Sequence, residues 1–238
     1  MTKLWFLLCA GTLLVLGCKH KAADNTTAND ATPPAIHNIP DDTVQMGNKT
    51  FFVYFIEKED FDKYPLPQVD SSEEDVLKKD SLVKREGNKL TIRLENGKQR
   101  VMANNNSDSD DYIGYTYVAN YPAIKRKGFI VTYYEGSGFE LVSIVNGDSM
   151  ITWSAPAVSP DKKYLLTASM DLVAAFDPNG FQLFSVDNGA VKPVGEISLT
   201  DWGPGMVQWI NNKTILSEYI TIDEEGVTQI QYVKMVMQ

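Results

Sequence analysis

The chain has 238 residues, of which 43% are apolar and 22% charged, so it can bury a core and is not disordered as a whole. Its formal net charge of −9 argues against nucleic acid as a partner, because affinity for phosphate backbones comes from clustered Lys and Arg. Its thiols and imidazoles all lie in the first 37 residues, at Cys9, Cys18, His20 and His37. This placement excludes Ser-His-Asp and Cys-His catalysis, and Cys/His zinc sites, from whatever folds after them.

The N-terminus is predicted to be a cleaved signal peptide covering residues 1–17. Its weakly polar to apolar run of 13 residues, Leu4 to Leu16, is too short for a membrane-spanning helix, which needs ~20 residues. The run ends in Val15-Leu16-Gly17-Cys18, which resembles a bacterial lipobox. This resemblance implies a lipoprotein in which Cys18 carries fatty acyl chains, such as palmitate, that hold it on a membrane. The alternative is ordinary secretory cleavage that leaves Cys18 as a free thiol.

Residues 18–47 are predicted to form the lipidated start and a flexible tether, followed by one domain over residues 48–238. From Lys19 to about Pro40 the chain is rich in Asn, Thr, Ala, Asp and Pro, a composition typical of linkers. By resemblance to Gram-negative lipoproteins, Lys19 rather than Asp after the cysteine favours the outer membrane. We therefore expect a bacterial cell-envelope location, with the membrane as a partner through the lipid anchor.

The domain is predicted to be all-β, because its apolar residues recur with a period near two, as in Leu90 to Leu94. Predicted strands run into Asn-Gly at Asn96, Asn146 and Asn188, which lie 50 and 42 residues apart. Asn-Gly between strands is typical of a two-residue hairpin turn in which both central residues have positive φ. The highly charged residues 57–86 are interpreted as an insertion in which a capping box at Ser71-Ser72-Glu73-Glu74 opens a short helix.

Several of these segments repeat along the chain. Residues 138–147 and 180–189 are identical at six of ten positions, and residues 122–132 parallel residues 156–167. The repeats predict units of roughly 40 to 50 residues with about four strands each, a period typical of propeller blades. The predicted units cover residues 48–103, 112–153, 154–198 and 202–238.

Val158 to Leu166, with Gln182 to Gly189, resembles the WD40-like repeat of TolB-type bacterial β-propellers. With Tyr133 to Gly136, Asp177 to Gly180 and Asp201 to Pro204 added, the chain is similar to small secreted bacterial proteins of unassigned function. The resemblance implies a small β-propeller-like array of about four blade units. An open β-sandwich built from the same hairpins is the alternative. Because the chain has fewer units than TolB and lacks its N-terminal domain, the role of TolB is not implied.

No metal or cofactor is predicted, and the chain is not expected to be an enzyme. The loop Asn104 to Asp111 offers oxygen ligands that suit Ca²⁺, but no register supplies the Gly and Glu that an EF-hand loop needs. Glu135, Asp171, Asp177 and Asp201 lie in or near predicted loops and could converge on one rim. Glycoside hydrolysis, which needs two carboxylates, is the one enzyme class left open, although no spacing singles out a pair.

Aromatic side chains in predicted loops are the best candidates for a binding surface, because they offer large contact areas with few torsions to freeze. Trp202 lies in a turn-rich segment and is expected to be an exposed anchor. Trp153 and Trp209 have strand-like neighbours and are expected in the core. The predicted binding residues are Trp202, Asp201, Tyr133, Tyr134, Glu135 and Asp177.

Anchor, tether, repeats and missing catalytic side chains together favour an envelope-anchored module that binds or scaffolds a protein or peptide partner. One alternative is a glycan-binding or glycan-active protein that uses loop carboxylates and aromatic rings. Another is a periplasmic immunity protein, whose acidity would suit a basic toxin.

Overall fold

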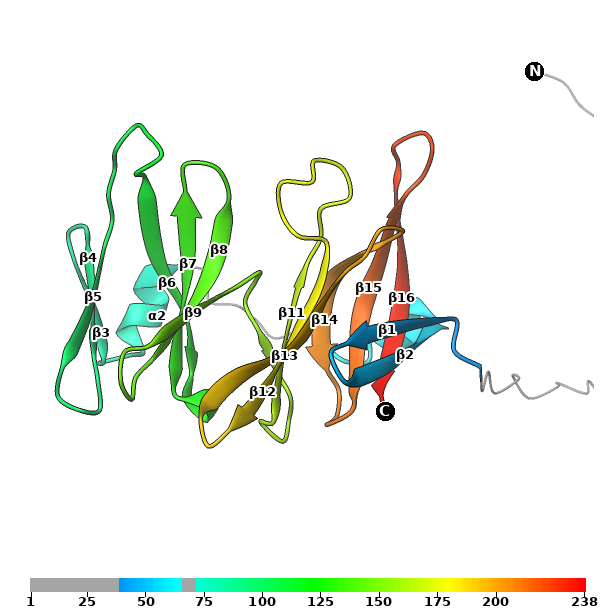
Figure 1. Cartoon of the computed structure of the whole chain (residues 1–238), viewed down its shortest axis with the longest axis horizontal. Coiled ribbons are helices and arrows are strands. Elements are labelled where there is room, and N and C mark those ends of the chain that lie inside the picture. The colour runs from blue at the N-terminus through cyan, green and yellow to red at the C-terminus, as the bar shows by residue number, and fades with distance from the viewer. Residues whose placement is uncertain (1–38, 66–71) are drawn as a thin grey trace, which may run out of the picture. The chain divides into compact units, whose positions relative to one another are not determined.

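Figure 1 shows a computed structural model of the chain, in which residues 39–65 and 72–238 are described. These residues form sixteen β-strands, two short α-helices and one 3₁₀ turn, so the domain is all-β. The strands make four antiparallel sheets, none of which closes into a barrel. No helix in the described ranges is long and apolar enough to cross a bilayer. The predicted signal peptide, Cys18 and the tether as far as residue 38 lie outside these ranges.

Three of the sheets are built from strands that follow one another along the chain. The β3–β5 sheet contains β3 (Val83–Glu86), β4 (Lys89–Arg93) and β5 (Gln99–Ala103). The β6–β9 sheet contains β6 (Ile113–Tyr121), β7 (Arg126–Tyr133), β8 (Ser137–Ser143) and β9 (Ser149–Thr152). The β10–β13 sheet contains β10 (Ala157–Val158), β11 (Tyr164–Ser169), β12 (Gly180–Asp187) and β13 (Ala190–Ser198). The expected units 112–153 and 154–198 each contain one of these sheets.

The fourth sheet, called the terminal sheet below, joins the two ends of the described domain. Its strands are, in spatial order, β1 (Asp42–Met46), β2 (Lys49–Ile56), β16 (Thr228–Met237), β15 (Thr214–Ile222) and β14 (Gly203–Trp209). Antiparallel pairing of β2 with β16 places Phe51 opposite Met237 and Val53 opposite Met235.

This pairing corrects two expected boundaries. Residues 42–46, assigned to the tether, form strand β1, which pairs with β2. The expected unit 48–103 is divided, because β2 belongs to the terminal sheet whereas β3, β4 and β5 form a sheet of their own. The period of a strand reports that one of its faces is buried, not which strand lies beside it, so the sequence did not identify the partner of β2.

Apolar side chains fill the interfaces between successive sheets. Ile92 of β4 packs with Tyr117 of β6 and Phe129 of β7, which joins the β3–β5 sheet to the β6–β9 sheet. A second cluster contains Leu141 of β8 and Phe184 of β12, which joins the β6–β9 sheet to the β10–β13 sheet. All five side chains are buried, so burial of apolar surface holds these sheets together.

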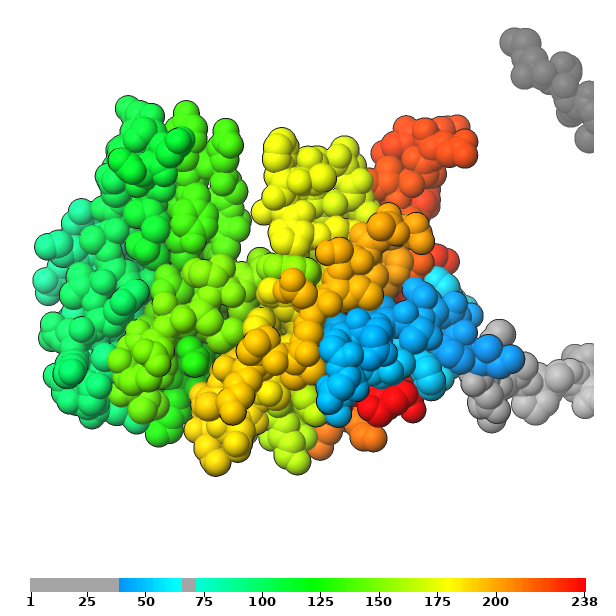
Figure 2. Space-filling model, in the orientation of Figure 1, coloured from blue at the N-terminus to red at the C-terminus, as the bar shows by residue number. Residues whose placement is uncertain are grey.

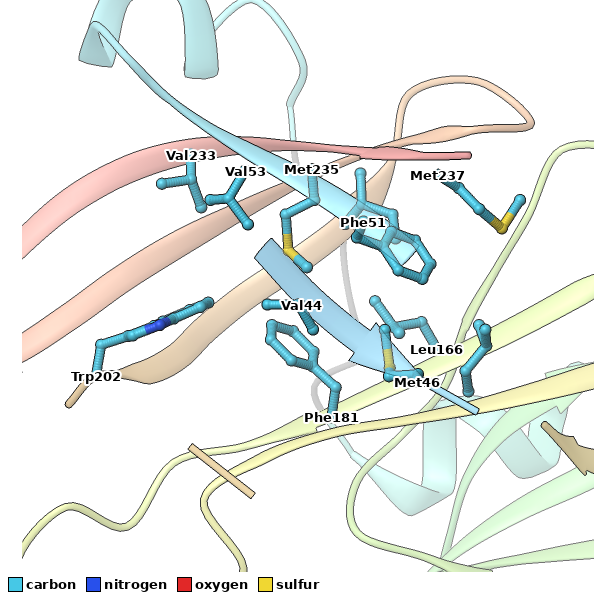
Figure 3. Close-up of a cluster of buried hydrophobic side chains, with 12 residues drawn as sticks. Val44, Met46, Phe51, Val53, Leu166, Phe181, Trp202, Val233, Met235 and Met237 are labelled. Atoms are coloured by element: carbon cyan, nitrogen blue, oxygen red, sulfur yellow. The ribbon is translucent and has the colours of Figure 1, made fainter. Parts of the chain in front are cut away.

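Strand β11 contributes to the core on both of its faces. Leu165 packs in the cluster shared with the β6–β9 sheet, and its neighbour Leu166 packs in a cluster shared with the terminal sheet. Successive side chains of a strand point to opposite faces, so the two leucines place the β10–β13 sheet between two neighbours. Figure 3 shows the cluster on the terminal-sheet side, where Phe181, Trp202 and Met235 point toward one another.

The Asn-Gly turns differ from one another. At Asn188-Gly189 both residues have positive φ, 48° and 83°, as the sequence predicts. At the other two turns only the glycines, Gly97 and Gly147, have positive φ, so the two-residue geometry expected there is wrong. At the first of these, the side-chain oxygen of Asn96 accepts a hydrogen bond from the N–H of Lys98 at 3.0 Å, which holds a different turn.

The charged segment after β2 contains helices α1 (Lys58–Phe61) and α2 (Glu73–Lys78). A short helix begins here as predicted, but the Ser72 hydroxyl accepts a hydrogen bond from the N–H of Asp75 at 3.2 Å, so the N-cap is Ser72, one residue later than the predicted capping box implies. Strand β3 also falls inside the predicted insertion, which is therefore shorter than expected.

A buried charge pair ties this insertion to the β6–β9 sheet. The Asp80 carboxylate, which follows α2, accepts hydrogen bonds from Lys127 Nζ on β7 and from the Tyr117 hydroxyl on β6. All three side chains are buried. Burial alone would raise the pKa of Asp80, but the hydrogen bonds from Lys127 and Tyr117 outweigh it and lower that pKa below its usual value.

Candidate functional site

Two loops enclose a hollow at the edges of neighbouring sheets. One is the β7–β8 turn (residues 134–136), and the other is the β11–β12 loop (residues 170–179). Figure 2 shows a gap between the green surface of the β6–β9 sheet and the yellow surface of the β11–β12 loop. The hollow between them, called the loop hollow, has a volume of about 640 Å³ and is lined by Tyr133, Glu135, Gly136, Ser137, Phe176 and Asp177.

The β11–β12 loop is organised around the carboxylate of Asp171. Its two oxygens accept hydrogen bonds from the backbone N–H groups of Val173 (3.2 Å), Ala174 (2.8 Å), Phe176 (2.8 Å) and Asp177 (3.0 Å). These N–H groups, that of Asp177 foremost, hold the pKa of Asp171 well below its usual range. The loop therefore has a defined backbone conformation although it projects from the sheet.

Asn179 fixes the other end of this loop. Its side-chain Nδ2 donates hydrogen bonds to the carbonyl oxygens of Leu199 (2.8 Å) and Trp202 (2.9 Å), and its Oδ1 accepts from the N–H of Asp171 at 3.3 Å. The next residue, Gly180, has a φ of 146°, and a Cβ there would lie 2.0 Å from the carbonyl oxygen of the facing strand. Both residues of this Asn-Gly pair are thus needed where the loop enters β12.

The loop carries apolar side chains into solvent. Val173 is 80% exposed and Phe176 is 91% exposed, and Met170 at the start of the loop is also exposed. Single exposed apolar residues are common on soluble proteins, but several on one ordered loop beside a hollow are typical of an interaction site.

The β7–β8 turn forms the opposite wall. It is tight, because the N–H of Tyr133 donates to the carbonyl of Gly136 at 3.1 Å and Gly136 has a φ of 97°. Tyr133 and Tyr134 are both exposed. Within the described ranges neither Glu135 on this wall nor Asp177 on the other forms an ion pair. The loop hollow thus combines two aromatic rings with two unpaired carboxylates.

A second hollow adjoins the first at Ser137. It has a volume of about 580 Å³ and lies over the β6–β9 sheet and the segment that leads to β10. Ile130, Phe139 and Trp153 are among its lining residues. Most of its exposed wall is apolar, and the one carboxylate residue that lines it, Glu73, is paired with Arg85 at 2.7 Å.

The structure brings together three of the six predicted binding residues. Tyr133, Glu135 and Asp177 line the loop hollow, and Tyr134 is exposed beside them in the β7–β8 turn. Asp201 is exposed and accepts a hydrogen bond from the Thr200 hydroxyl at 3.2 Å, but it does not line the hollow.

Trp202 is not an exposed anchor, and that expectation is wrong. Its side chain is only 2% exposed and belongs to the core shared with the terminal sheet. The ring stacks on Tyr219 with centroids 4.3 Å apart and meets Phe181 edge-on at 5.7 Å. The turn-rich neighbours correctly indicate a chain reversal, but the tryptophan immediately precedes β14 and points inward from it.

Sequence reasoning missed Phe176, the more exposed of the two aromatic residues of the loop hollow. The sequence feature that could have indicated it is the apolar run from Val173 to Phe176, which lies between Asp171 and the turn-forming residues 177–179. Such a run between loop-forming residues lies outside any strand pattern. Of the other tryptophans, Trp209 is half-buried and donates from Nε1 to the carbonyl of Ala157 at 3.1 Å.

The carboxylates near the loop hollow bear on acid catalysis and on metal binding. Asp171 cannot act as a general acid near neutral pH, because its pKa is lowered rather than raised. In the described ranges no group of three or more His, Cys, Asp or Glu side chains lies close enough together to hold a metal ion.

Comparison of this chain with protein-family models, with curated proteins and with solved structures finds no match in any of the three.

Proposed function

We propose that this protein is a lipoprotein of the bacterial cell envelope whose β-domain holds a protein or peptide partner without catalysing a reaction. The anchor is Cys18, at the end of a short apolar run, and the tether gives the domain freedom to stand off the outer membrane. Because Cys18 would carry the acyl chains, the membrane is itself a proposed partner.

One observation carries the binding role: an ordered loop presents Val173 and Phe176 to solvent beside a hollow. Exposed apolar surface is unfavourable unless something covers it, and a partner would recover that free energy. The four hydrogen bonds to Asp171 hold the loop in advance, so less conformational entropy is lost when a partner binds.

We further propose that the four sheets form a small propeller-like array. The pairing of β2 with β16 supports it, because the two ends of the described domain meet in one sheet. The apolar clusters support stacking of blade-like sheets, since they join the β3–β5, β6–β9, β10–β13 and terminal sheets in that order. An open β-sandwich uses the same contacts and is the alternative.

A glycan ligand is the second candidate, supported by Tyr133 and Phe176 lining one hollow together with Glu135. Aromatic rings can pack against sugar rings, and carboxylates can accept hydrogen bonds from sugar hydroxyls. Screening peptidoglycan fragments and polysaccharides by thermal shift separates this candidate from a peptide binder. The immunity-protein reading is a special case of the first proposal, in which the partner is a basic toxin.

The binding role is tested by photo-crosslinking in intact cells. A benzophenone amino acid replaces Phe176 in one variant and Val101, which is 51% exposed on β5, in a control. We expect a reproducible adduct from position 176 that position 101 does not give. The purified adduct partner should bind the Val173→Ser/Phe176→Ser variant at least tenfold more weakly than the unaltered protein. Equal adducts from both positions, or none from position 176, would overturn the proposal.

A further inference from the structure

We propose that the loop hollow takes the cationic side chain of a Lys or Arg residue in a partner peptide. This inference rests on the proposed function and specifies its ligand. Glu135 stands on one wall and Asp177 on the other, so both walls of the hollow carry a negative charge.

The two carboxylates have no cationic partner among the described residues. An anionic ligand would meet like charge from both walls. A purely apolar ligand would remove Glu135 and Asp177 from water without replacing their hydration, which is unfavourable. A cation satisfies both groups, and it does so without a competing ion pair to break.

The aromatic rings favour the same ligand. Tyr133 and Phe176 line the hollow with the carboxylates, and the face of an aromatic ring attracts a cation. Lys and Arg also carry aliphatic stems that pack on apolar surface while the charged head stays near water. Such a stem would cover Phe176, which is 91% exposed.

The adjoining hollow indicates a peptide rather than a small ammonium ion. It meets the loop hollow at Ser137 and is lined by apolar side chains that include Ile130 and Trp153. A chain segment with a basic residue next to an apolar one would fill both hollows. The net charge of −9 would in addition attract a basic partner from a distance.

The test uses the full chain, purified in detergent, and three probe peptides compared by saturation-transfer NMR. The peptides are acetyl-Gly-Leu-Arg-Leu-Gly-amide and the same sequence with norleucine or glutamate in place of arginine. We expect the arginine peptide to bind at least tenfold more tightly than the norleucine peptide, and the glutamate peptide not to bind. The preference should weaken as salt is added.

A matched pair of variants locates the effect. Glu135→Gln/Asp177→Asn removes two charges from the loop hollow and should abolish most of the preference for arginine. Glu224→Gln/Glu225→Gln removes two charges from the exposed β15–β16 turn and should leave the preference unchanged.

Three results would overturn the inference. Equal binding of the arginine and norleucine peptides would show an apolar site, and an equal loss in both variants would show only a long-range effect of net charge. If none of the three peptides binds, a basic peptide is not the ligand of the loop hollow. None of these results affects the crosslink from position 176, so the proposed binding function stands or falls separately.

Discussion

The carboxylate of Asp171 accepts a hydrogen bond from the backbone N–H of Phe176 at 2.8 Å, which holds the backbone of the most exposed aromatic residue of the loop hollow. In the Asp171→Ala variant four N–H groups lose this acceptor. We expect hydrogen exchange at residues 173–177 to accelerate at least tenfold, while the melting temperature changes little because the loop lies outside the core. Unchanged exchange in this loop would show that it is ordered by something else.

The same carboxylate predicts how the loop responds to pH. The folded-state pKa of Asp171 is below the usual value of about 3.9, so its ionised form stabilises the loop at any pH above that value. This contribution is lost only as the pH falls through the lowered folded-state pKa. We therefore expect NMR spectra of residues 173–177 to be unchanged from pH 7 to pH 4.5. A transition of these signals between pH 4.5 and 6 would contradict the lowered pKa.

Trp202 shows where sequence reasoning fails. Its neighbours in the chain correctly predict a turn, but the direction of its side chain depends on Tyr219 and Phe181, which lie on other strands. Local sequence cannot reveal such contacts. We expect Trp202→Ala to destabilise the protein by about 3 to 5 kcal/mol, as loss of a large buried side chain does. Urea unfolding measures this.

The exposed Val101 provides the control for that experiment. Val101→Ser should change the free energy of unfolding by no more than about 0.5 kcal/mol, because the side chain is half exposed on the outer part of β5. If Trp202→Ala has an equally small effect, the tryptophan does not belong to the core.

Features that depend on neighbouring residues in the chain could be predicted from the sequence, whereas features that depend on distant residues could not. Alternation of apolar residues correctly predicts an all-β domain, and the Ser-Ser-Glu-Glu stretch at residues 71–74 correctly predicts a short helix, because both signals are local. The pairing of β2 with β16 is not local, so the boundaries around residue 48 were wrong. Residue type and predicted loop position point to Tyr133, Glu135 and Asp177 as binding residues, and the structure places them around one hollow. Phe176 was missed because its apolar run belongs to no strand.

The buried pair of Lys127 and Asp80 predicts a large effect of a small change. Asp80→Asn leaves the Lys127 ammonium buried without a counter-charge, which we expect to cost about 3 to 5 kcal/mol of stability. Asp62→Asn removes a pairing with Lys58 on the surface and should cost much less stability, because water and salt screen an exposed pair. Chemical denaturation compares the two. Adding Lys127→Met to Asp80→Asn should recover part of the loss, and failure to do so would place the cost elsewhere.

The proposed lipidation of Cys18 predicts where the protein is found in the cell. The unaltered protein should remain with the membrane fraction in high salt and be released only by detergent, since two or three acyl chains hold a protein almost permanently. Cys18→Ser should move it to the soluble fraction of the envelope, because no acyl chain can then be attached. Mass spectrometry of the N-terminal peptide should show Cys18 as the first residue, carrying the mass of its acyl chains. An unmodified Cys18, or membrane retention of the Cys18→Ser variant, would refute the anchor but leave the loop hollow and its peptide tests untouched.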